Sequence, residues 1–270
     1  MSLYAVVGNP VAHSKSPRIH QMFAEQTGQD LEYVAITVES SGFNAFVHKF
    51  FDDGGQGLNV TVPFKEAAYE LADQHAPRAA LAKSVNTLFL DGSGVLCGDN
   101  TDGLGLTRDI QENNGFSIQD KRVLMLGAGG AVRGVLAELI NHQPQSIKLL
   151  NRTLSRAETL VGEFATHFTL EVQNYDDFSD SSFDLIINGT TLSLSGELPA
   201  LDPRTLADGC CCYDMMYGDE DTVFVTWAKD NGAALALDGL GMLVEQAAES
   251  FAIWRGVHPQ TAPVIKALRH

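Results

Sequence analysis

Short apolar runs alternate with stretches of helical periodicity along most of this chain. In the second half, apolar runs at 123–126, 147–150, 183–188 and 209–216 are separated by turn residues and amphipathic segments. This order predicts βαβ units, in which buried parallel strands are joined by helices that cover the sheet. We therefore expect a doubly wound, Rossmann-like α/β domain in this part of the chain.

The first hundred residues show a shorter and more irregular alternation, which favours a separate domain. The last long helix starts after Gly239–Met242 and carries its apolar residues on one face, and we expect it to return to the first domain. The predicted division is 1–101 with 239–270, against 102–238. In the first part we expect strands at 4–8, 31–38, 58–62 and 84–90, and helices from Ser16, at 43–51 and across 66–82.

Composition and charge exclude several partners. The 270 residues are 44% apolar, and 18 Lys plus Arg against 34 Asp plus Glu give a net charge of −16. Such a chain repels nucleic acid and anionic membranes, so an anionic ligand needs a locally basic site. Neither the four cysteines nor the eight histidines match a metal or redox spacing, and no signal peptide or long apolar span is present. We expect a cytoplasmic protein without a metal site.

A glycine-rich turn follows the 123–126 run and opens the next helix. A helix N-terminus offers unpaired N–H groups to a phosphate, and glycine lets the phosphate approach the backbone. Val132 stands where the dinucleotide fingerprint has Gly or Ala, so glycine needed only for helix packing is the alternative. The candidate residues for the turn are Gly127, Ala128, Gly129, Gly130 and Ala131.

Arg152 follows the second strand of this unit, where an NAD-binding protein usually carries an acidic residue for the ribose. Arg156 lies one helical turn later, and Arg133 is a third candidate for a basic site. Guanidinium groups suit a 2′-phosphate, which favours NADP. The alternative is a pair of solvated arginines, although cations gain little in a first helical turn.

Five polar residues of the first part are candidates for chemistry. Ser16 before Pro17 is typical of a helix N-cap, whereas Ser14 is not explained by capping, and the two hydroxyls could bind a carboxylate together. Asn59 and Thr61 should project from one face of a strand that ends near Lys65. Lys65, at the end of this strand beside the two polar residues, is the further candidate, and an ordinary surface lysine is the alternative.

Three further positions are candidates on local pattern. Thr101 or Asp102 would cap the following helix, and a carboxylate held there would also suit a base or a proton partner. Gly189–Thr191 follows a buried strand, at the sheet edge where doubly wound folds place ligands. Gln246 lies beside the apolar face of the last long helix, where a buried amide needs a partner.

Taken together, these motifs resemble the shikimate dehydrogenase family over almost the whole chain. They are Ser14–Pro17, Asn59–Lys65, Val85–Thr87, Gly98–Gly103, Gly127–Ala131, Asn151–Thr153 and Asp238–Leu243. The resemblance implies a mixed-sheet substrate domain, an NADP-binding Rossmann-like domain, and reversible NADPH-dependent reduction of 3-dehydroshikimate to shikimate in aromatic amino acid biosynthesis. A small-molecule substrate is the expected partner, and a homodimer is compatible with the sequence.

The resemblance also implies a role for each matching residue. Lys65 and Asp102 resemble the catalytic pair, and Ser14 with Ser16 resembles the clamp on the substrate carboxylate. Partners for the ring hydroxyls would be Asn59, Thr61, Asn86, Tyr217 and Gln246. The NADP site would comprise Gly127, Ala128, Gly129, Gly130, Ala131, Asn151, Arg152, Thr153 and Arg156, with Thr190, Met215 and Gly239 near the nicotinamide.

Some positions depart from the family pattern, and other functions stay open. The chain has Lys83–Ser84 where the family usually has Gly-Ala, Gly189 where it has Ala, and Val223 where it has Pro. A quinate/shikimate dehydrogenase that prefers NAD is one alternative enzyme. A catalytically silent dinucleotide sensor is another class, against which the presence of both Lys65 and Asp102 argues.

Overall fold

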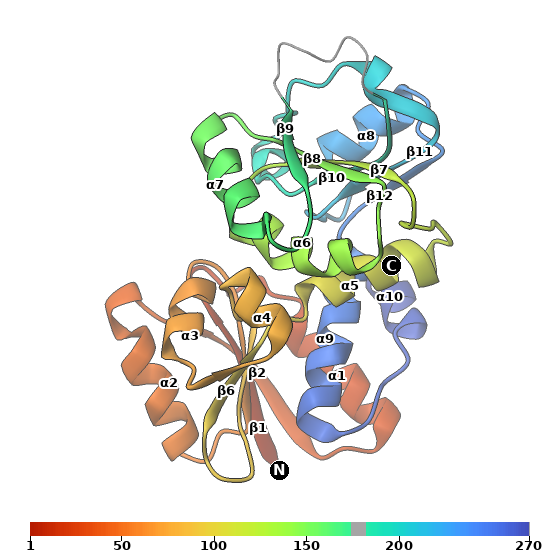
Figure 1. Cartoon of the computed structure of the whole chain (residues 1–270). Helices are drawn as coiled ribbons and strands as arrows, with labels where there is room; N and C mark the ends of the chain where they lie inside the picture. The colour runs from red at the N-terminus through yellow and green to blue at the C-terminus, as the bar shows by residue number, and fades with distance from the viewer. Residues whose placement is uncertain (174–181, 270) are drawn as a thin grey trace. The chain divides into compact units, whose positions relative to one another are not determined.

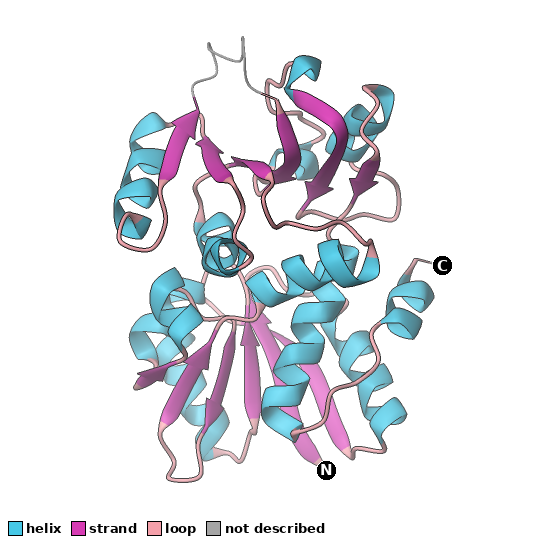
Figure 2. Cartoon of the chain, turned by 45° about the vertical axis from the view of Figure 1, so that its right-hand side comes forward, coloured by secondary structure: helices cyan, strands magenta, loops and turns pink. Residues whose placement is uncertain are grey.

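The computed structural model of the chain describes residues 1–173 and 182–269, which form two units (Figures 1 and 2). One unit holds Met1–Gly105 with Leu243–His270, and the other holds Leu106–Met242. Each junction falls four residues beyond the one expected from the sequence.

The first unit is built on a six-stranded mixed sheet with the order β2-β1-β3-β5-β6-β4. β1 runs parallel to β2 and β3, β5 runs antiparallel to β3 and β6, and β4 runs parallel to β6. The strands are β1 (Ser2–Gly8), β2 (Leu31–Thr37), β3 (Gly57–Val60), β4 (Gln74–His75), β5 (Thr87–Leu90) and β6 (Leu96–Asp99). The sheet is mixed, as predicted.

Helices cover both faces of this sheet, and the alternation of β1 shows how. Ala5 and Val7 pack into a core with residues of α2, α3 and α4, whereas Tyr4 and Val6 point to the other face, where Trp254 of α9 lies. The helices of this unit are α1 (Ser16–Thr27), η1 (Ser40–Gly42), α2 (Phe43–Asp52), α3 (Lys65–Leu71), α4 (Pro77–Ala82), α9 (Leu240–Arg255) and α10 (Ala262–Leu268).

The expectation of one helix across 66–82 is wrong. α3 ends at Leu71, residues 74–75 form the short strand β4, and a new helix begins at Pro77. Proline cannot continue a helix and pushes the preceding residue towards extended backbone, and Ala76 is indeed extended with ψ 149°. The alanine-rich composition therefore obscured a break that proline imposes. The strand expected at 58–62 also ends earlier, at Val60, and Val62 is 68% exposed.

The second unit is a doubly wound domain, as predicted. Its six strands are all parallel and follow the order β12-β11-β10-β7-β8-β9, which is the Rossmann order. The strands are β7 (Arg122–Leu126), β8 (Ser146–Leu150), β9 (Leu170–Gln173), β10 (Phe183–Asn188), β11 (Leu206–Asp214) and β12 (Leu235–Leu237). The order reverses between β7 and β10, so their carboxyl ends mark the place where such folds bind ligands.

The helices of this unit are α6 (Gly130–Asn141), α7 (Leu154–Phe164), α8 (Val223–Asp230), η3 (Leu192–Ser195) and η4 (Pro203–Thr205), while α5 (Asp102–Arg108) and the π-helical turn η2 (Asp109–Asn113) lead into it. On the face that α8 covers, Phe224 packs with Cys210 and Cys212. Cys211 is equally buried, and all three thiols are free. The consecutive cysteines thus belong to the core of β11.

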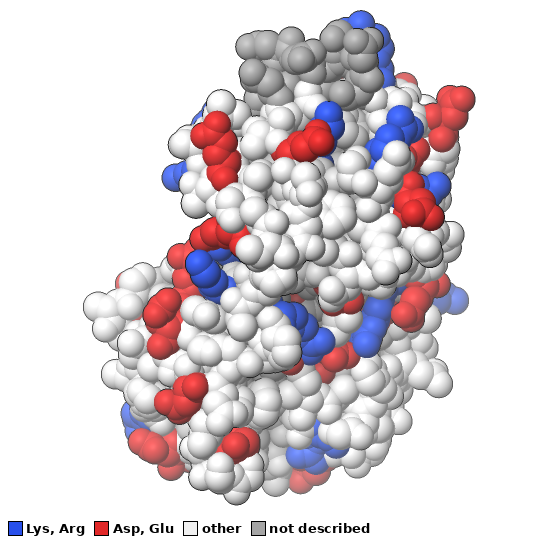
Figure 3. Space-filling view, in the orientation of Figure 1, with Lys and Arg blue, Asp and Glu red and all other residues white. Residues whose placement is uncertain are grey.

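Within the described residues, no helix is both long and apolar enough to cross a bilayer. A search of the same residues gives no group of three or more His, Cys, Asp or Glu that could hold a metal ion. On the face drawn in Figure 3, acidic and basic side chains are both scattered among uncharged ones.

The side chain of Val132 occupies the space that a side chain at position 189 would need. Val132 is fully buried at the start of α6, and its Cγ2 would lie 2.4 Å from a Cβ added at Gly189. That distance is shorter than any real Cβ contact, and a valine side chain has little freedom to move away. The valine at the sixth fingerprint position therefore requires glycine at 189.

We expect Gly189→Ala to lower the free energy of unfolding by about 1–3 kcal/mol, because the added methyl overpacks this contact. In a Val132→Ala background the same change should cost at least about 0.5 kcal/mol less. Urea unfolding of the four proteins measures the coupling. Gly162→Ala is the matched control, because that glycine lies in α7 with open space around its Cβ position and should not destabilise. Additive effects of the two changes would contradict the steric account.

Candidate active site and cofactor site

An ion pair joins Lys65 and Asp102 in the first unit. Lys65 begins α3 and Asp102 begins α5, and Lys65 Nζ lies 2.5 Å from Asp102 Oδ2. Their side chains are 21% and 9% exposed, so the pair is largely shielded while the ammonium keeps some access. The predicted catalytic residues are therefore in direct contact, although they lie on different helices.

The carboxylate of Asp102 does not cap its helix. Asn100 Oδ1 accepts the bond from the Asp102 N–H at 3.1 Å, while Asp102 Oδ1 accepts from Asn86 Nδ2 at 2.9 Å. Asp102 does not cap the helix, because its two carboxylate oxygens are engaged by Lys65 and Asn86. A capping role for Thr101, the residue that precedes α5, stays a prediction. Asp102 is left free to hold Lys65.

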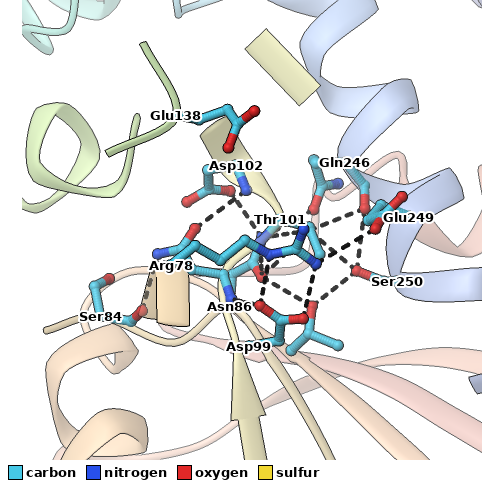
Figure 4. A network of polar contacts seen from close by, with 12 residues as sticks. Arg78, Ser84, Asn86, Asp99, Thr101, Asp102, Glu138, Gln246, Glu249 and Ser250 are labelled. Atoms are coloured by element: carbon cyan, nitrogen blue, oxygen red, sulfur yellow. Dashed lines mark hydrogen bonds and ion pairs between the residues drawn. The ribbon is translucent and has the colours of Figure 1, made fainter. Parts of the chain in front are cut away.

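Asn86 is the centre of a buried polar network, which Figure 4 shows. Besides Asp102, its Nδ2 donates to Thr101 Oγ1 at 2.9 Å and to Gln246 Oε1 at 3.3 Å, and its Oδ1 accepts from the Thr101 N–H at 2.9 Å. The side chain is buried, so each of these contacts is protected from water. One amide, just before β5, thus joins the start of α5 to the helix α9.

Asn59 is engaged by protein groups on both sides of its amide. Its Oδ1 accepts from the Tyr33 hydroxyl at 2.7 Å, and its Nδ2 donates to the Asn86 carbonyl at 3.2 Å and to Ser250 Oγ at 3.0 Å. Burial raises the pKa of Tyr33 well above its ordinary value, against the lowering effect of a hydrogen bond with Ser16. A role for Asn59 towards a substrate hydroxyl stays a prediction.

Ser14, and not Ser16, accepts a hydrogen bond at the start of α1. Ser16 is the first residue of α1, and Ser14 Oγ accepts a bond from the Ser16 N–H at 3.2 Å. Ser16 makes no cap bond, so the expectation that it is the N-cap is wrong, because the serine–proline pattern sits one position inside the helix. Thr61, just beyond β3, packs its Cγ2 against Gly8.

The glycine turn of the second unit has the geometry that an anion requires. Gly127 has φ +105°, a conformation that side chains disfavour. Gly129 and Gly130 are exposed, and a Cβ added at either would meet nothing within 4 Å. They open the 12-residue helix α6, so its N-terminal N–H groups are accessible to a phosphate.

The two arginines near the β8 end are exposed, and neither forms an ion pair with any residue in the described parts of the chain. Arg152 precedes α7 and Arg156 lies in its first turn, while Asn151 Nδ2 donates to the Thr153 carbonyl at 2.8 Å. Arg133, the third basic candidate, is instead paired with Glu163. Arg152 and Arg156 are therefore the pair available for an anion.

Thr190, Met215 and Gly239 lie around the carboxyl ends of β10 and β11. Thr190 N and Oγ1 donate to Asn188 Oδ1 at 3.1 and 2.7 Å, and Met215 N donates to the Asn188 carbonyl at 2.9 Å. A Cβ added at Gly239 would lie 2.3 Å from the Met215 carbonyl oxygen, so glycine is needed for this close approach. Tyr217 also belongs to this unit, and burial raises its pKa.

A buried carboxylate that the sequence did not single out lies beneath this edge. Asp214 is fully buried and accepts bonds from Ser193 at 2.6 Å, from Thr222 at 2.7 Å and from Asn188 at 3.1 Å. Burial raises its pKa, and the three donors act in the opposite direction. Asp214 stands at the end of a buried apolar strand, and that position is the sequence signal that could have revealed it.

Further residues near Lys65 and Asp102 were also missed. Ser250 lies one turn after Gln246 on α9, and its Oγ contacts Thr87 and Thr101. Arg78 forms a forked pair with Asp99, inside the Gly98–Gly103 motif. Ser250 could have been found from its i, i+4 spacing to Gln246. Asp99 could have been found from its position within the Gly98–Gly103 motif.

A lysine–carboxylate pair on one unit and a Rossmann sheet with an open glycine turn on the other define a dinucleotide-dependent oxidoreductase. Comparisons with known proteins narrow this class. Residues 6–88 match the shikimate dehydrogenase substrate binding domain, 109–194 the shikimate / quinate 5-dehydrogenase family, and 239–269 the shikimate 5′-dehydrogenase C-terminal domain. The chain belongs to the shikimate dehydrogenase family.

Whole proteins give the same result. The chain is 57% identical to shikimate dehydrogenase (NADP(+)) of Alkalilimnicola ehrlichii over 98% of both chains. The crystal structure of an Ael1 enzyme from Pseudomonas putida matches with a TM-score of 0.95 and 43% identity, over 100% of this chain and 99% of that one. Shikimate 5-dehydrogenase of Thermus thermophilus in complex with NADP(H) and shikimate matches with a TM-score of 0.88 and 30% identity, over 100% and 99%.

Replacing both Ser14 and Ser16 by alanine should raise KM for 3-dehydroshikimate more than it lowers kcat. The two serines are predicted to bind the substrate carboxylate. This group is present in both substrate and transition state, so the serines should stabilise both states equally. Steady-state kinetics at saturating NADPH measures the two constants. Ser93→Ala is the control, because that serine bonds only within the exposed turn at Asp91. An unchanged KM would leave the serines with their local structural roles.

Proposed function

We propose that this member of the shikimate dehydrogenase family catalyses the reversible NADPH-dependent reduction of 3-dehydroshikimate to shikimate, with Lys65 and Asp102 as the catalytic pair. The reaction and the cofactor follow from the relatives named above. The observation that carries the residue assignment is the ion pair of 2.5 Å between Lys65 and Asp102, whose carboxylate is also held by the predicted site residue Asn86.

The first unit is the proposed substrate domain. Ser14 and Ser16 would bind the carboxylate, and Asn86 and Gln246 would present amide groups to the ring hydroxyls, together with Asn59 and Thr61. Tyr217, which belongs to the second unit, is the remaining residue proposed to contact a hydroxyl. Hydrogen bonds to hydroxyls discriminate strongly against analogues that lack them, because the site's buried polar groups are then left unpaired. The amides of Asn86 and Gln246 are already in contact, which supports a common site.

Lys65 would supply the proton. As the carbonyl of 3-dehydroshikimate gains a hydride at carbon, its oxygen gains negative charge and needs a proton. The Lys65 ammonium is a donor, and the adjacent Asp102 carboxylate orients it and stabilises the positive charge until transfer occurs. In the oxidation direction the same pair accepts the proton from the shikimate hydroxyl.

The second unit fits NADP, which supplies or accepts the hydride when bound. The exposed Gly129 and Gly130 leave the backbone at the start of α6 open to the pyrophosphate, where helix N–H groups favour an anion. Arg152 and Arg156 would bind the 2′-phosphate, with Asn151 and Thr153 beside them. Thr190, Met215 and Gly239 would lie near the nicotinamide. A reducing cytoplasm is the proposed location, supported by the free thiols.

Cofactor choice tests this proposal, because Arg152 and Arg156 should form charge-assisted bonds with the 2′-phosphate. The parent protein should reduce 3-dehydroshikimate with NADPH at a much higher kcat/KM than with NADH. Arg152→Ala should lower kcat/KM for NADPH by roughly tenfold or more and Arg156→Ala by less, since a charged hydrogen bond contributes about 1.5–3 kcal/mol before exposure reduces it. NADH kinetics should barely change.

Initial rates with NADPH and with NADH, in the parent and both variants, give kcat/KM for each cofactor. Arg204→Ala is the matched control, because that exposed arginine is paired with Asp202 and lies outside the proposed site. Equal use of NADPH and NADH by the parent would overturn the cofactor assignment. Faster oxidation of quinate than of shikimate would instead favour the quinate/shikimate alternative.

A further inference from the structure

We propose that Arg78 is a positioning residue for the Lys65–Asp102 pair, acting through Asp99 and Asn100. The inference rests on the proposed function, because it assumes that the pair is catalytic. Arg78 lies on α4 and contacts neither Lys65 nor Asp102 in any contact described above, so its effect would be indirect.

The first step is the pair of Arg78 with Asp99. Arg78 Nε donates to Asp99 Oδ1 and Arg78 Nη2 to Asp99 Oδ2, each at 2.7 Å, which is the forked geometry that fixes both side chains (Figure 4). Their side chains are 25% and 10% exposed. A largely shielded forked pair holds its geometry better than a surface ion pair.

The second step leads from Asp99 to Asp102. Asp99 Oδ1 also accepts from the Asn100 N–H at 2.7 Å. Asn100 in turn donates from Nδ2 to the Ser84 carbonyl at 2.9 Å and accepts at Oδ1 from the Asp102 N–H at 3.1 Å. The orientation of Asn100 therefore fixes the backbone at the start of α5, from which the Asp102 carboxylate reaches Lys65.

Arg78 is a poor candidate for binding the substrate anion itself. Its guanidinium meets a second carboxylate, because Arg78 Nη2 also donates to Glu249 Oε1 at 3.3 Å. Two carboxylates, of Asp99 and Glu249, therefore already engage this one guanidinium, which leaves it little capacity to bind a further anion. Burial, the largest single influence, lowers the pKa of Arg78, but the bonds to Asp99 and Glu249 together raise it above its ordinary value.

The alternative is that the Arg78–Asp99 pair contributes only to stability. The second unit offers a matched control, because Arg122 forms a comparable forked pair with Asp184, with Nε and Nη2 each 2.9 Å from a carboxylate oxygen. Arg122 begins β7, at the end of the strand opposite the glycine turn. Loss of Arg122 removes the same kind of bond without touching the chain of contacts to Asp102.

The experiment compares Arg78→Ala, Arg78→Lys, Arg122→Ala and Lys65→Ala in the full chain, with kcat, KM and the thermal unfolding midpoint measured for each. Arg78→Ala should lower kcat about tenfold, since misplacement of a reacting group by a fraction of an ångström is costly, while KM for both substrates changes less than about threefold. Arg78→Lys keeps the charge but loses the fork, so it should fold and restore kcat in part. Arg122→Ala should keep kcat within about twofold of the parent.

The outcomes separate this inference from the proposed function. If Lys65→Ala abolishes activity while both Arg78 variants keep kcat within twofold, the positioning role is overturned and the catalytic pair stands. A loss of kcat that merely follows the loss of stability, and is equal in Arg122→Ala, also overturns it. If Lys65→Ala itself stays within a few-fold of the parent, the catalytic assignment fails and the inference fails with it.

Discussion

The contact between the Lys65 ammonium and the Asp102 carboxylate is the interaction around which the first unit is arranged. An ion pair that is largely removed from water is stabilising only when the remaining polar atoms of the carboxylate are also satisfied. Asp102 meets that condition because one oxygen faces Lys65 and the other accepts from Asn86. The network that supplies this amide joins Asn86 to Thr101 and to Gln246 of α9, so it links segments that lie far apart in the chain.

The second unit meets a different constraint, which is close backbone approach at the carboxyl edge of its sheet. Gly127, Gly189 and Gly239 each stand where a side chain would meet a neighbouring backbone or the buried Val132. Asp214 lies beneath the same edge and fixes it through neutral donors rather than a cation. The exposed Arg152 and Arg156 near β8 make that part of the edge basic, which suits a phosphate.

Periodicity was enough to predict the second unit, because its central strands β7, β8 and β10 are largely buried apolar runs with turn residues on both sides. It failed at 66–82, where alanine is compatible with helix but Pro77 forces a new start. The expectation that Ser16 caps α1 failed for a related reason, since Ser16 is already the first helical residue and Ser14 accepts the bond from its N–H. Which of several neighbouring polar side chains takes an N–H depends on tertiary position, and a local pattern does not contain it. The forked pair of Arg78 with Asp99 joins residues 21 positions apart and was likewise beyond local reading.

The central claim is that Lys65, held by Asp102, transfers the proton during carbonyl reduction, and a single turnover measures this most directly. Enzyme in excess, loaded with NADPH, is mixed with 3-dehydroshikimate, and the rate constant of NADPH oxidation is compared in the parent, Lys65→Ala and Asp102→Asn. NADPH affinity is determined in parallel, because the proposed cofactor residues belong to the other unit and should be unaffected. We predict a rate constant lowered by roughly two orders of magnitude or more in both variants, with unchanged NADPH affinity and stability. A rate constant within a few-fold of the parent in Lys65→Ala would contradict the account.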